Sequence, residues 1–455
     1  MASLAVLLKQ KGHDVWGADQ NLYSPMSDLL SENQIKVYKG YTPEHLNEYF
    51  DQVIIGNALS RGNKEVEEIL NRRLPFTSLP ELIYQEFLKE QKSIVITGTH
   101  GKTTTTGLMS WILEAAALAP SFLVGGILKN FGFSSNFGKG DYFVIEGDEY
   151  DTAFFDKRPK FLHYFPHILI INNIEFDHSD IYDNIDQIKN EFKKLVRIIP
   201  KNGLIIANGD DKNVREVLEK SFTRVWYFGK ARENNWSFEL LNTGDDKTHF
   251  KVLNDSKKFY EFNIPMMGEY QVYNSLAVIA AATFIGLEPA DIQKGLDSFQ
   301  GVKRRLEYWG QINGAYFYDD FAHHPTAIKE TLKALHKKHP EKAIVAIFEP
   351  RTNTTIKNIF QTELAEAFSH AEIIILTPVH RADKIPVEKR LSLKKLAADL
   401  KKMGRIVYPE ENYQEIPLRI KKVLDASKVA VLMTNGDLGG QYQILKNNIQ
   451  KFSTT

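Results

Sequence analysis

Residues 93–106 of the chain read Ser93-Ile94-Val95-Ile96-Thr97-Gly98-Thr99-His100-Gly101-Lys102-Thr103-Thr104-Thr105-Thr106. A short β-branched run gives way to glycines, and an apolar helical pattern follows. This order predicts a strand, a phosphate loop and a helix. In such a loop, glycines let backbone N–H groups close around phosphate oxygens, and the positive N-terminus of the helix faces them. The stretch therefore predicts binding of a nucleoside triphosphate.

Two side chains of this phosphate loop (residues 98–103) suit the same ligand. Lys102 adds a positive charge for the phosphates, and Thr103 offers a hydroxyl to Mg²⁺. The match to the general pattern G-x-x-x-x-G-K-[ST] is incomplete, because Ile96 takes the place of its first glycine. A chance glycine turn before a helix is the alternative. We favour a binding site, because strand, loop, lysine, hydroxyl and helix all follow in the required order.

The composition indicates a globular protein with small-molecule ligands. A chain of 455 residues has room for about three domains, and 43% apolar with 25% charged residues is ordinary for a soluble protein. Basic and acidic residues balance at 57 each, so no broad basic field exists to hold nucleic acid or an anionic membrane. We expect no nucleic-acid partner.

The absence of cysteine and of long apolar runs excludes several further kinds of site and segment. The chain has no cysteine, which excludes disulfides, thiolate nucleophiles and cysteine zinc sites, and fits a cytoplasmic location. No apolar run approaches the roughly 18 residues that a membrane span needs, and the N-terminus lacks the pattern of a signal peptide. We expect no membrane insertion, and the sequence leaves the oligomeric state open.

Residues 1–88 predict part of a Rossmann-like α/β domain, with a helix over residues 4–11 and strands over residues 14–19 and 52–57. In such domains an acid at the end of the second strand meets a ribose, and Asp19 stands at that place. The first strand and its glycine-rich turn are missing, because the sequence begins inside the first helix. Either the true start lies upstream, or this form has a damaged N-terminal site.

Residues 89–301 predict a second, nucleotide-binding α/β domain of the P-loop ATPase type. Strands over residues 142–146, 168–173 and 204–208 accompany the phosphate-loop strand. Residues 225–265 alternate aromatic and polar side chains around turn signals, which predicts an antiparallel sheet appended to this domain.

Residues 302–455 return to alternating strands and helices, which predicts a Rossmann-like C-terminal α/β domain. The expected strands cover residues 343–348, 371–377, 405–408 and 429–434, and the expected helices cover residues 325–336 and 356–368.

Several charged side chains are candidates for binding a metal, a phosphate or a carboxylate. Glu146 ends one strand and His178 follows the next, so both belong at strand ends beside the phosphate loop and could share a metal. A solvated acidic turn and an ordinary polar histidine are the alternatives. Arg304 and Arg305 could neutralise a γ-phosphate, or form an interdomain salt bridge. Arg351 suits bidentate binding of a carboxylate, or only starts a helix.

Five motifs across nearly the whole chain resemble, in family order, those of the Mur ligases. They are Gly98-Thr99-His100-Gly101-Lys102-Thr103-Thr104, Glu146-Gly147-Asp148-Glu149-Tyr150-Asp151, Asn173-Ile174-Glu175-Phe176-Asp177-His178, Arg304-Arg305-Leu306-Glu307 and Asp319-Asp320-Phe321-Ala322-His323-His324-Pro325-Thr326. The resemblance implies the three-domain Mur ligase architecture, whose domains bind a UDP-muramoyl substrate, ATP and the incoming amino acid or peptide.

Three further stretches indicate a branch of the family. They are Asn57-Ala58-Leu59-Ser60-Arg61-Gly62-Asn63, Phe154-Phe155-Asp156-Lys157-Arg158 and Glu349-Pro350-Arg351-Thr352-Asn353-Thr354. They are similar to members that join UDP-N-acetylmuramate to the murein tripeptide L-alanyl-γ-D-glutamyl-meso-diaminopimelate in peptidoglycan recycling. The resemblance implies an ATP- and Mg²⁺-dependent reaction through an acyl phosphate. Two alternatives remain: the member that adds free L-alanine, and a nucleotide-binding protein inactivated by loss of the N-terminal turn.

The resemblance also implies roles for individual residues. The ATP-binding positions are Gly98, Thr99, His100, Gly101, Lys102, Thr103, Thr104, Asn274, Arg305 and Asp320. The metal positions are Thr103, Glu146 and His178. The substrate positions are Asp19, Asn57, Ser60 and Arg351. The catalytic positions are Lys102, His178, Arg305 and His323. One departure is the pair Tyr270-Gln271, where the adenine-binding helix of the family commonly has His-Asn.

Overall fold

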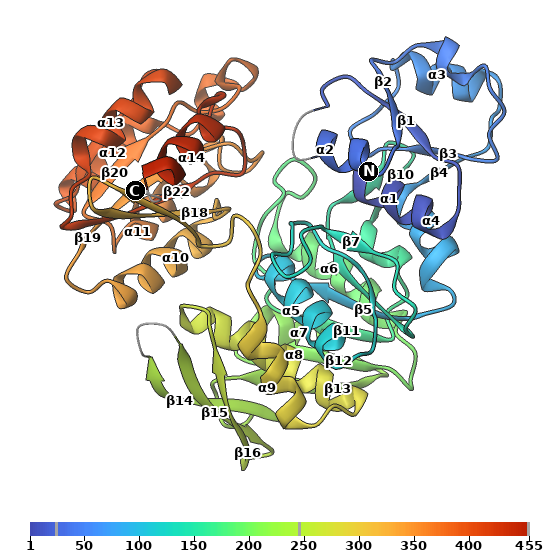
Figure 1. Ribbon diagram of the computed structural model, residues 1–455, viewed down its shortest axis with the longest axis horizontal. Helices are drawn as coiled ribbons and strands as arrows, with labels where there is room; N and C mark the ends of the chain where they lie inside the picture. Colours follow the sequence, from blue (N-terminus) through green and yellow to red (C-terminus); the bar gives the residue numbers. More distant parts are fainter. Residues whose placement is uncertain (23–25, 244–246, 453–455) are drawn as a thin grey trace.

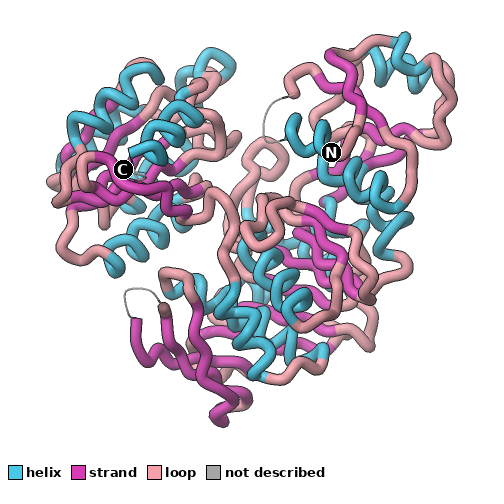
Figure 2. The backbone as a smooth tube through the Cα atoms, in the orientation of Figure 1, coloured by secondary structure: helices cyan, strands magenta, loops and turns pink. Residues whose placement is uncertain are grey.

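The computed structural model describes residues 1–22, 26–243 and 247–452, which form three α/β regions (Figure 1). In Figure 1 the blue N-terminal region lies at the upper right, the orange and red C-terminal region at the upper left, and the central region below both. Figure 2 shows strands flanked by helices in the central and C-terminal regions. Among the described residues, no helix combines the length and apolar character that a membrane span requires.

The N-terminal region contains two separate parallel strand pairs. Its elements are α1 (Ala2–Lys11), β1 (Trp16–Asp19), α2 (Met26–Glu32), β2 (Lys36–Lys39), η1 (Pro43–Leu46), β3 (Val53–Ile55), α3 (Lys64–Asn71), β4 (Phe76–Ser78), α4 (Leu79–Ile83) and η2 (Tyr84–Leu88). β1 pairs with β2, and β3 pairs with β4. The Rossmann order 3-2-1-4-5 places the first strand between these pairs. The two pairs therefore correspond to the strands on either side of the centre of a Rossmann-like sheet.

The central region is built on one large, mainly parallel sheet of strand order β16-β15-β14-β13-β12-β11-β5-β8-β6-β7. Its strands are β5 (Lys92–Thr97), β6 (Ser121–Leu123), β7 (Ser135–Asn136), β8 (Tyr142–Gly147), β11 (Ile168–Ile171), β12 (Leu204–Asn208), β13 (Arg224–Gly229), β14 (Trp236–Thr243), β15 (Thr248–Asn254) and β16 (Lys257–Ile264), beside the small pair β9 (Asp151–Ala153) and β10 (Asp156–Pro159). Its helices are α5 (Lys102–Ala115), η3 (Lys160–His163), α6 (Ile185–Arg197), α7 (Lys212–Leu218), α8 (Glu269–Ile285) and α9 (Pro289–Ser298).

Hydrophobic packing on both faces fixes this sheet. Successive side chains of a strand point to opposite faces, and in β5 the side chains of Ile94 and Ile96 join one core while Val95 joins the other. The first core also contains Leu108 of α5 and Leu276 of α8, so these helices cover that face. β5, which leads into the phosphate loop, is therefore held rigidly at the centre of the region.

The expectation of an appended antiparallel sheet over residues 225–265 needs a correction. β13 pairs in parallel with β12, and only β14, β15 and β16 pair with one another as antiparallel strands. All four strands continue the central sheet instead of forming a separate one. Residues 244–246 of the interval lie outside the described residues.

The C-terminal region has a six-stranded sheet of order β17-β18-β22-β19-β20-β21. Its strands are β17 (Glu307–Ile312), β18 (Ala315–Asp320), β19 (Ala343–Phe348), β20 (Ile373–Leu376), β21 (Ile406–Pro409) and β22 (Lys428–Met433). Its helices are α10 (Pro325–Lys338), η4 (Asn358–Phe360), α11 (Gln361–Ala367), η5 (Ala382–Lys384), η6 (Val387–Lys389), α12 (Leu393–Lys402), η7 (Tyr413–Glu415), α13 (Ile416–Val423) and α14 (Gln441–Phe452). The four expected strands are β19 to β22.

The hairpin of β17 and β18 was not expected. These antiparallel strands meet at Asn313 and Gly314, whose φ angles are 52° and 80°. Two such residues in sequence are the strongest short-range hairpin signal. The Asn-Gly pair is therefore the sequence signal by which this hairpin could have been predicted.

Candidate active site

The phosphate loop requires glycine at both of its glycine positions. Gly98 has a φ of 127°, and a Cβ there would lie 2.9 Å from the backbone N and O of Asn173. Gly101 has a φ of 82°, and a Cβ there would lie 2.7 Å from Oδ1 of Asn274. A side chain at either position would meet both backbone strain and a close contact. The loop is thus packed tightly against β11 and α8.

The segment after β11 holds the loop in place. The backbone N of His100 donates to Oδ1 of Asn173 at 2.8 Å, and the hydroxyl of Thr99 donates to the backbone O of Glu175 at 3.2 Å. Thr104 is buried in the first turn of α5. The loop amides are therefore oriented before any ligand arrives, as phosphate binding requires.

Lys102 lies against a buried carboxylate. Its Nζ donates to the backbone O of Gly98 at 2.6 Å and to Oε2 of Glu149 at 3.1 Å. Glu149 is only 2% exposed. Burial opposes the charged form of Lys102, but the carboxylates of Glu149 and Asp148 keep its pKa above the usual value. The lysine is therefore a firmly charged group at the centre of the loop.

His178 shares Glu149 with the lysine. Its Nε2 lies 3.2 Å from Oε1 of Glu149, and the hydroxyl of Tyr182 donates to the backbone O of Glu149 at 2.6 Å. Burial alone would lower the pKa of His178, but the hydrogen bond and charge of Glu149, aided by Asp177 and Asp148, raise it to about 9. The expected partner was Glu146, whereas the direct partner in the structure is Glu149. His178 and Glu149 therefore form a charged pair at neutral pH.

Glu146 and Thr103 present oxygen atoms to the same point. The hydroxyl of Thr103 donates to Oε2 of Glu146 at 3.3 Å, and the backbone N of Gly125 donates to Oε1. Burial raises the pKa of Glu146. Nη2 of Arg305, from the C-terminal side, donates to the Thr103 hydroxyl at 2.9 Å. A carboxylate and a hydroxyl beside a phosphate loop are the donors that Mg²⁺ prefers.

A cavity of about 590 Å³ opens beside the phosphate loop. His100 and Gly101 line it, as does Asn274, whose Nδ2 donates to Oε1 of Gln271 at 3.1 Å. The other lining residues are Asn172, Asn173, Ile174, Glu175, Asn208, Asp210, Asp211, Lys212, Asn213, Phe228, Glu269, Tyr270, Tyr273, Thr326, Glu330 and Lys333. The volume is typical of small-molecule sites, and the many amides and carboxylates suit a polar ligand such as a nucleoside.

Asp320 does not line this cavity. Its Oδ2 accepts from the backbone N of Leu306, and its Oδ1 accepts from the backbone N of Ala322 at 2.7 Å. Asp320 therefore links Leu306, which directly precedes β17, to Ala322, which follows β18. Burial raises the pKa of its carboxyl.

His323 and Arg351 lie on the C-terminal side. Nδ1 of His323 bonds to the backbone O of Phe321 at 2.9 Å, and burial lowers the pKa of this histidine. Nη1 of Arg351 lies 3.3 Å from Oε1 of Glu349 and 2.9 Å from Oδ1 of Asp437. Because β19 and β22 are neighbours, Arg351 and Asp437 belong to the loops after two adjacent strands. Open α/β sheets bind ligands at such places.

The three N-terminal candidates are less closely joined to this site. Nδ2 of Asn57 donates to the backbone O of Asp151 at 3.0 Å and so links the N-terminal and central regions. Asp19 is exposed at the end of β1, and its Oδ1 accepts from the backbone N of Asn21. Ser60 is also exposed. Of the three, Asn57 alone is shown bonded to the central region.

Three residues of the quoted motifs were not among the predicted site residues: Glu149, Glu175 and His324. Glu149 is one of three acids in the run 146–149, and the sequence gives no reason to prefer it to Glu146. Its burial between Lys102 and His178 is a three-dimensional property. The structure therefore adds it to the candidate residues.

The fold and the site together define a class. A phosphate loop in the central region, completed by an arginine of a following α/β region, agrees with the family models that match this chain: "Mur ligase family, catalytic domain" over residues 1–90, "Mur ligase middle domain" over residues 96–282, and "Mur ligase, glutamate ligase domain" over residues 304–436. The chain belongs to the Mur ligase family.

Individual relatives point to one branch. The UDP-N-acetylmuramate–L-alanyl-γ-D-glutamyl-meso-2,6-diaminoheptandioate ligase of Escherichia coli K12 is 39% identical over 99% of this chain and 96% of its own length. The crystal structure of a murein peptide ligase from Psychrobacter arcticus 273-4 is 33% identical, with a TM-score of 0.75, and the match covers 99% of this chain and 96% of that one. The UDP-N-acetylmuramate–L-alanine ligase of Caldicellulosiruptor bescii is 34% identical over 96% of this chain and 94% of its own.

Proposed function

We propose that this chain is an ATP-dependent ligase of the EC 6.3.2 class that joins UDP-N-acetylmuramate to the murein tripeptide L-alanyl-γ-D-glutamyl-meso-diaminopimelate in peptidoglycan recycling. The observation that carries the proposal is the 39% identity to the Escherichia coli enzyme of that name over nearly the full length of both chains. The L-alanine ligase of Caldicellulosiruptor bescii is less similar, at 34%. We therefore favour the tripeptide over free L-alanine as the acceptor.

The first step is phosphoryl transfer. Lys102 and the amides of residues 98–101 hold the phosphates of ATP, and Arg305 neutralises charge that develops on the γ-phosphate. A lactyl carboxylate oxygen attacks the γ-phosphorus, the bond to the bridging oxygen breaks, and ADP leaves. The product is an acyl phosphate. Asn274 and the other polar groups of the 590 Å³ cavity are positioned to hold the adenosine.

The second step is amide formation. The peptide amine attacks the acyl carbon, the carbon–oxygen bond to phosphate breaks, and the amine loses a proton. His323, whose pKa is lowered by burial, is neutral near pH 7 and can accept a proton. Arg351 with Asp437 offers one positive and one negative group to the peptide, which itself carries both charges. Asp19, Asn57 and Ser60 are our proposed contacts to the UDP-sugar.

The residues at the phosphate loop also fit Mg²⁺. Thr103 and Glu146 would hold the ion through oxygen, and it would supply positive charge to the phosphates. His178 carries a proton at neutral pH in this arrangement, since its pKa is about 9. It would have to release that proton to become a ligand, because metal binding requires neutral imidazole.

Two further proposals concern the chain as a whole. We propose domain boundaries after residues 88 and 301, supported by the end of η2 at Leu88 and the gap between α9, which ends at Ser298, and β17. We also propose a cytoplasmic location, supported by the use of ATP and a UDP-sugar as substrates.

The decisive experiment measures ADP release with Mg²⁺, ATP and UDP-N-acetylmuramate, and with the tripeptide, L-alanine or no acceptor. We expect release that depends on the tripeptide. Release that depends on L-alanine would instead assign the chain to the L-alanine-adding ligases. ATP binding without turnover under all three conditions would support the inactive nucleotide-binding alternative.

A further inference from the structure

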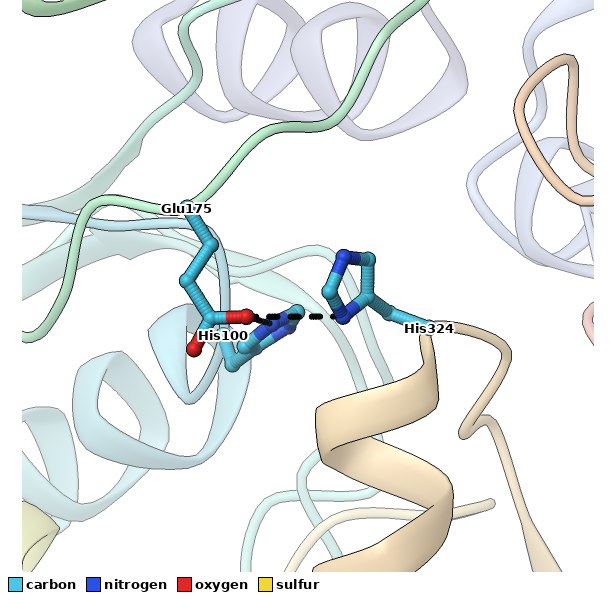
Figure 3. Close-up of side chains that lie close together, drawn as sticks. All are labelled: His100, Glu175 and His324. Carbon is cyan, nitrogen blue, oxygen red and sulfur yellow. Dashed lines mark hydrogen bonds and ion pairs between the residues drawn. The ribbon is translucent and has the colours of Figure 1, made fainter. Parts of the chain in front are cut away.

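Three side chains from two regions meet at the edge of the 590 Å³ cavity, which two of them also line. His100 belongs to the phosphate loop, Glu175 follows β11, and His324 precedes α10 of the C-terminal region (Figure 3). Nε2 of His100 lies 3.3 Å from Oε2 of Glu175, and Nδ1 of His324 lies 3.6 Å from the same oxygen. One atom from each residue falls within 4.8 Å of the other two. Two imidazoles and a carboxylate thus converge across the boundary between two regions.

The spacing of these atoms matches a tetrahedral metal site. Zinc binds imidazole nitrogen and carboxylate oxygen at about 2.0–2.2 Å, so neighbouring ligand atoms in a tetrahedron lie about 3.3–3.6 Å apart. The two distances to Oε2 of Glu175, 3.3 Å and 3.6 Å, fall in this range. Three protein ligands would leave one position for water.

The surrounding hydrogen bonds already orient two of the three ligands. Nε2 of His324 donates to the backbone O of Phe176 at 3.2 Å, and Nδ1 accepts from the backbone N of Thr326 at 3.3 Å. The proton is therefore on Nε2, and the lone pair of Nδ1 would bind a metal by giving up its 3.3 Å contact with the backbone N of Thr326. The Thr326 hydroxyl donates to Oε2 of Glu175 at 2.6 Å. Metal ligands typically make hydrogen bonds of this kind: the histidine donates its other ring N–H to a backbone carbonyl, and the carboxylate accepts from a neighbouring side chain.

We propose that His100, Glu175 and His324 bind a divalent transition metal of the Zn²⁺ type between the central and C-terminal regions. This site is distinct from the oxygen site of Thr103 and Glu146, because two imidazoles select zinc and its neighbours over Mg²⁺. A metal held from both sides would link the two regions in the arrangement that the structure shows.

The test is a titration of the full chain with Zn²⁺, and separately with Co²⁺, in the absence of nucleotide and Mg²⁺. Calorimetry gives the stoichiometry and affinity for Zn²⁺, and the visible absorption of Co²⁺ reports tetrahedral coordination. We expect one site with tetrahedral Co²⁺ absorption. Failure of the unmodified chain to bind either ion would overturn the proposal.

Two variants and one control locate the metal. His324→Asn keeps an acceptor for the N-terminus of α10 but removes the imidazole, and Glu175→Gln keeps the shape but removes the charge. Each should weaken zinc binding at least tenfold. His178→Gln is the matched control, because His178 lies in a second cluster with Asp148 and Glu149 that has the same spacing limit. It should leave the zinc affinity unchanged.

The outcomes separate the two clusters. Zinc affinity that survives both His324→Asn and Glu175→Gln, or that is lost only in His178→Gln, would contradict the proposed site. Circular dichroism checks that each variant is folded, and if His324→Asn is not, Glu175→Gln carries the test. Zinc should also raise the melting temperature of the unmodified chain but not of Glu175→Gln.

Discussion

Nη2 of Arg305 donates to the hydroxyl of Thr103 at 2.9 Å, and so an arginine after α9 reaches the phosphate loop 202 residues earlier in the chain. The preceding residue points elsewhere: Nη2 of Arg304 donates to the backbone O of Thr434 at 2.7 Å and of Gly436 at 3.1 Å. The two adjacent arginines therefore contact different parts of the protein. Arg305 contacts the phosphate loop, and Arg304 bonds to the segment that follows β22 in the C-terminal region.

The first prediction separates these two roles. Arg305→Lys should lower turnover by about 10²–10³-fold, because it removes a fixed donor from the transferring phosphate. Its melting temperature should stay close to that of the unmodified chain. Arg304→Lys is the matched control and should destabilise the protein by about 1–3 kcal/mol through lost bonds to the backbone carbonyls of Thr434 and Gly436. Steady-state ADP release and thermal unfolding measure both effects, and equal loss of turnover in the two variants would contradict the assignment.

The second prediction concerns Gly101. Gly101→Ala should raise the dissociation constant for ATP at least tenfold, because its Cβ would lie 2.7 Å from Oδ1 of Asn274. Gly132 has the same φ of 82° but nothing within 4 Å of a Cβ. Gly132→Ala therefore carries the same backbone strain, about 1 kcal/mol, without the contact. Calorimetric titration with ATP should show weaker binding in Gly101→Ala alone.

The third prediction is a pH dependence of stability at Asp319. This carboxylate is fully buried, accepts from the hydroxyl of Tyr442, and lies 3.6 Å from Nε of Arg304. Burial raises its pKa from 3.8 to about 7 despite Arg304. The folded state therefore binds the proton more tightly than the unfolded state. The stabilisation that this proton gives is complete below pH 3.8 and is lost as the pH rises to about 7.

The measurement compares the unfolding free energy of the unmodified chain with that of Asp319→Asn across pH. The difference, unmodified minus variant, should fall by a few kcal/mol between about pH 4 and pH 7 and then stay level. A difference that is flat over this range would show that Asp319 titrates normally. The variant serves as the reference for all other titrating groups, because they are common to both proteins.

The fourth prediction tests the acceptor side. Arg351→Gln should raise the KM for the tripeptide at least tenfold and leave the KM for ATP near its original value, because a charged pair to a carboxylate is lost. The exposed Arg232, which pairs with Glu239 in the central region, provides the control. Arg232→Gln should change neither constant. A rise in the KM for ATP with Arg351→Gln would contradict this prediction and would indicate that Arg351 contacts the nucleotide instead.

Much of the fold could be predicted from the sequence. The strands β5, β8, β11 and β12 are buried apolar runs, and such runs are visible without a structure. The phosphate loop was visible because glycine, lysine and hydroxyl must stand in a fixed order. The three-domain α/β architecture is confirmed by the structure and the family.

The direction of a strand and the partners of a side chain were harder to predict. β13 reads like its antiparallel neighbours, because strand direction leaves little trace in composition. The β17–β18 hairpin was hidden by Glu307, Asp319 and Asp320, whose charges break the apolar alternation. The pairing of His178 with Glu149 depends on burial that only the folded chain supplies. The roles of the site residues stay predictions.

The position of β22 in its sheet has a consequence for biosynthesis. β22 begins at Lys428 and is the last strand along the chain, yet it lies between β18 and β19 in the middle of the C-terminal sheet. While the ribosome is still producing this region, β18 and β19 have no central strand to pair with. A chain cut short before Lys428 lacks the middle of the sheet, as well as the loop that brings Asp437 to Arg351. Translation must therefore pass β22 and the loop at Asp437 before this sheet can close and Arg351 can find its partner, and products cut short earlier are left for proteases to remove.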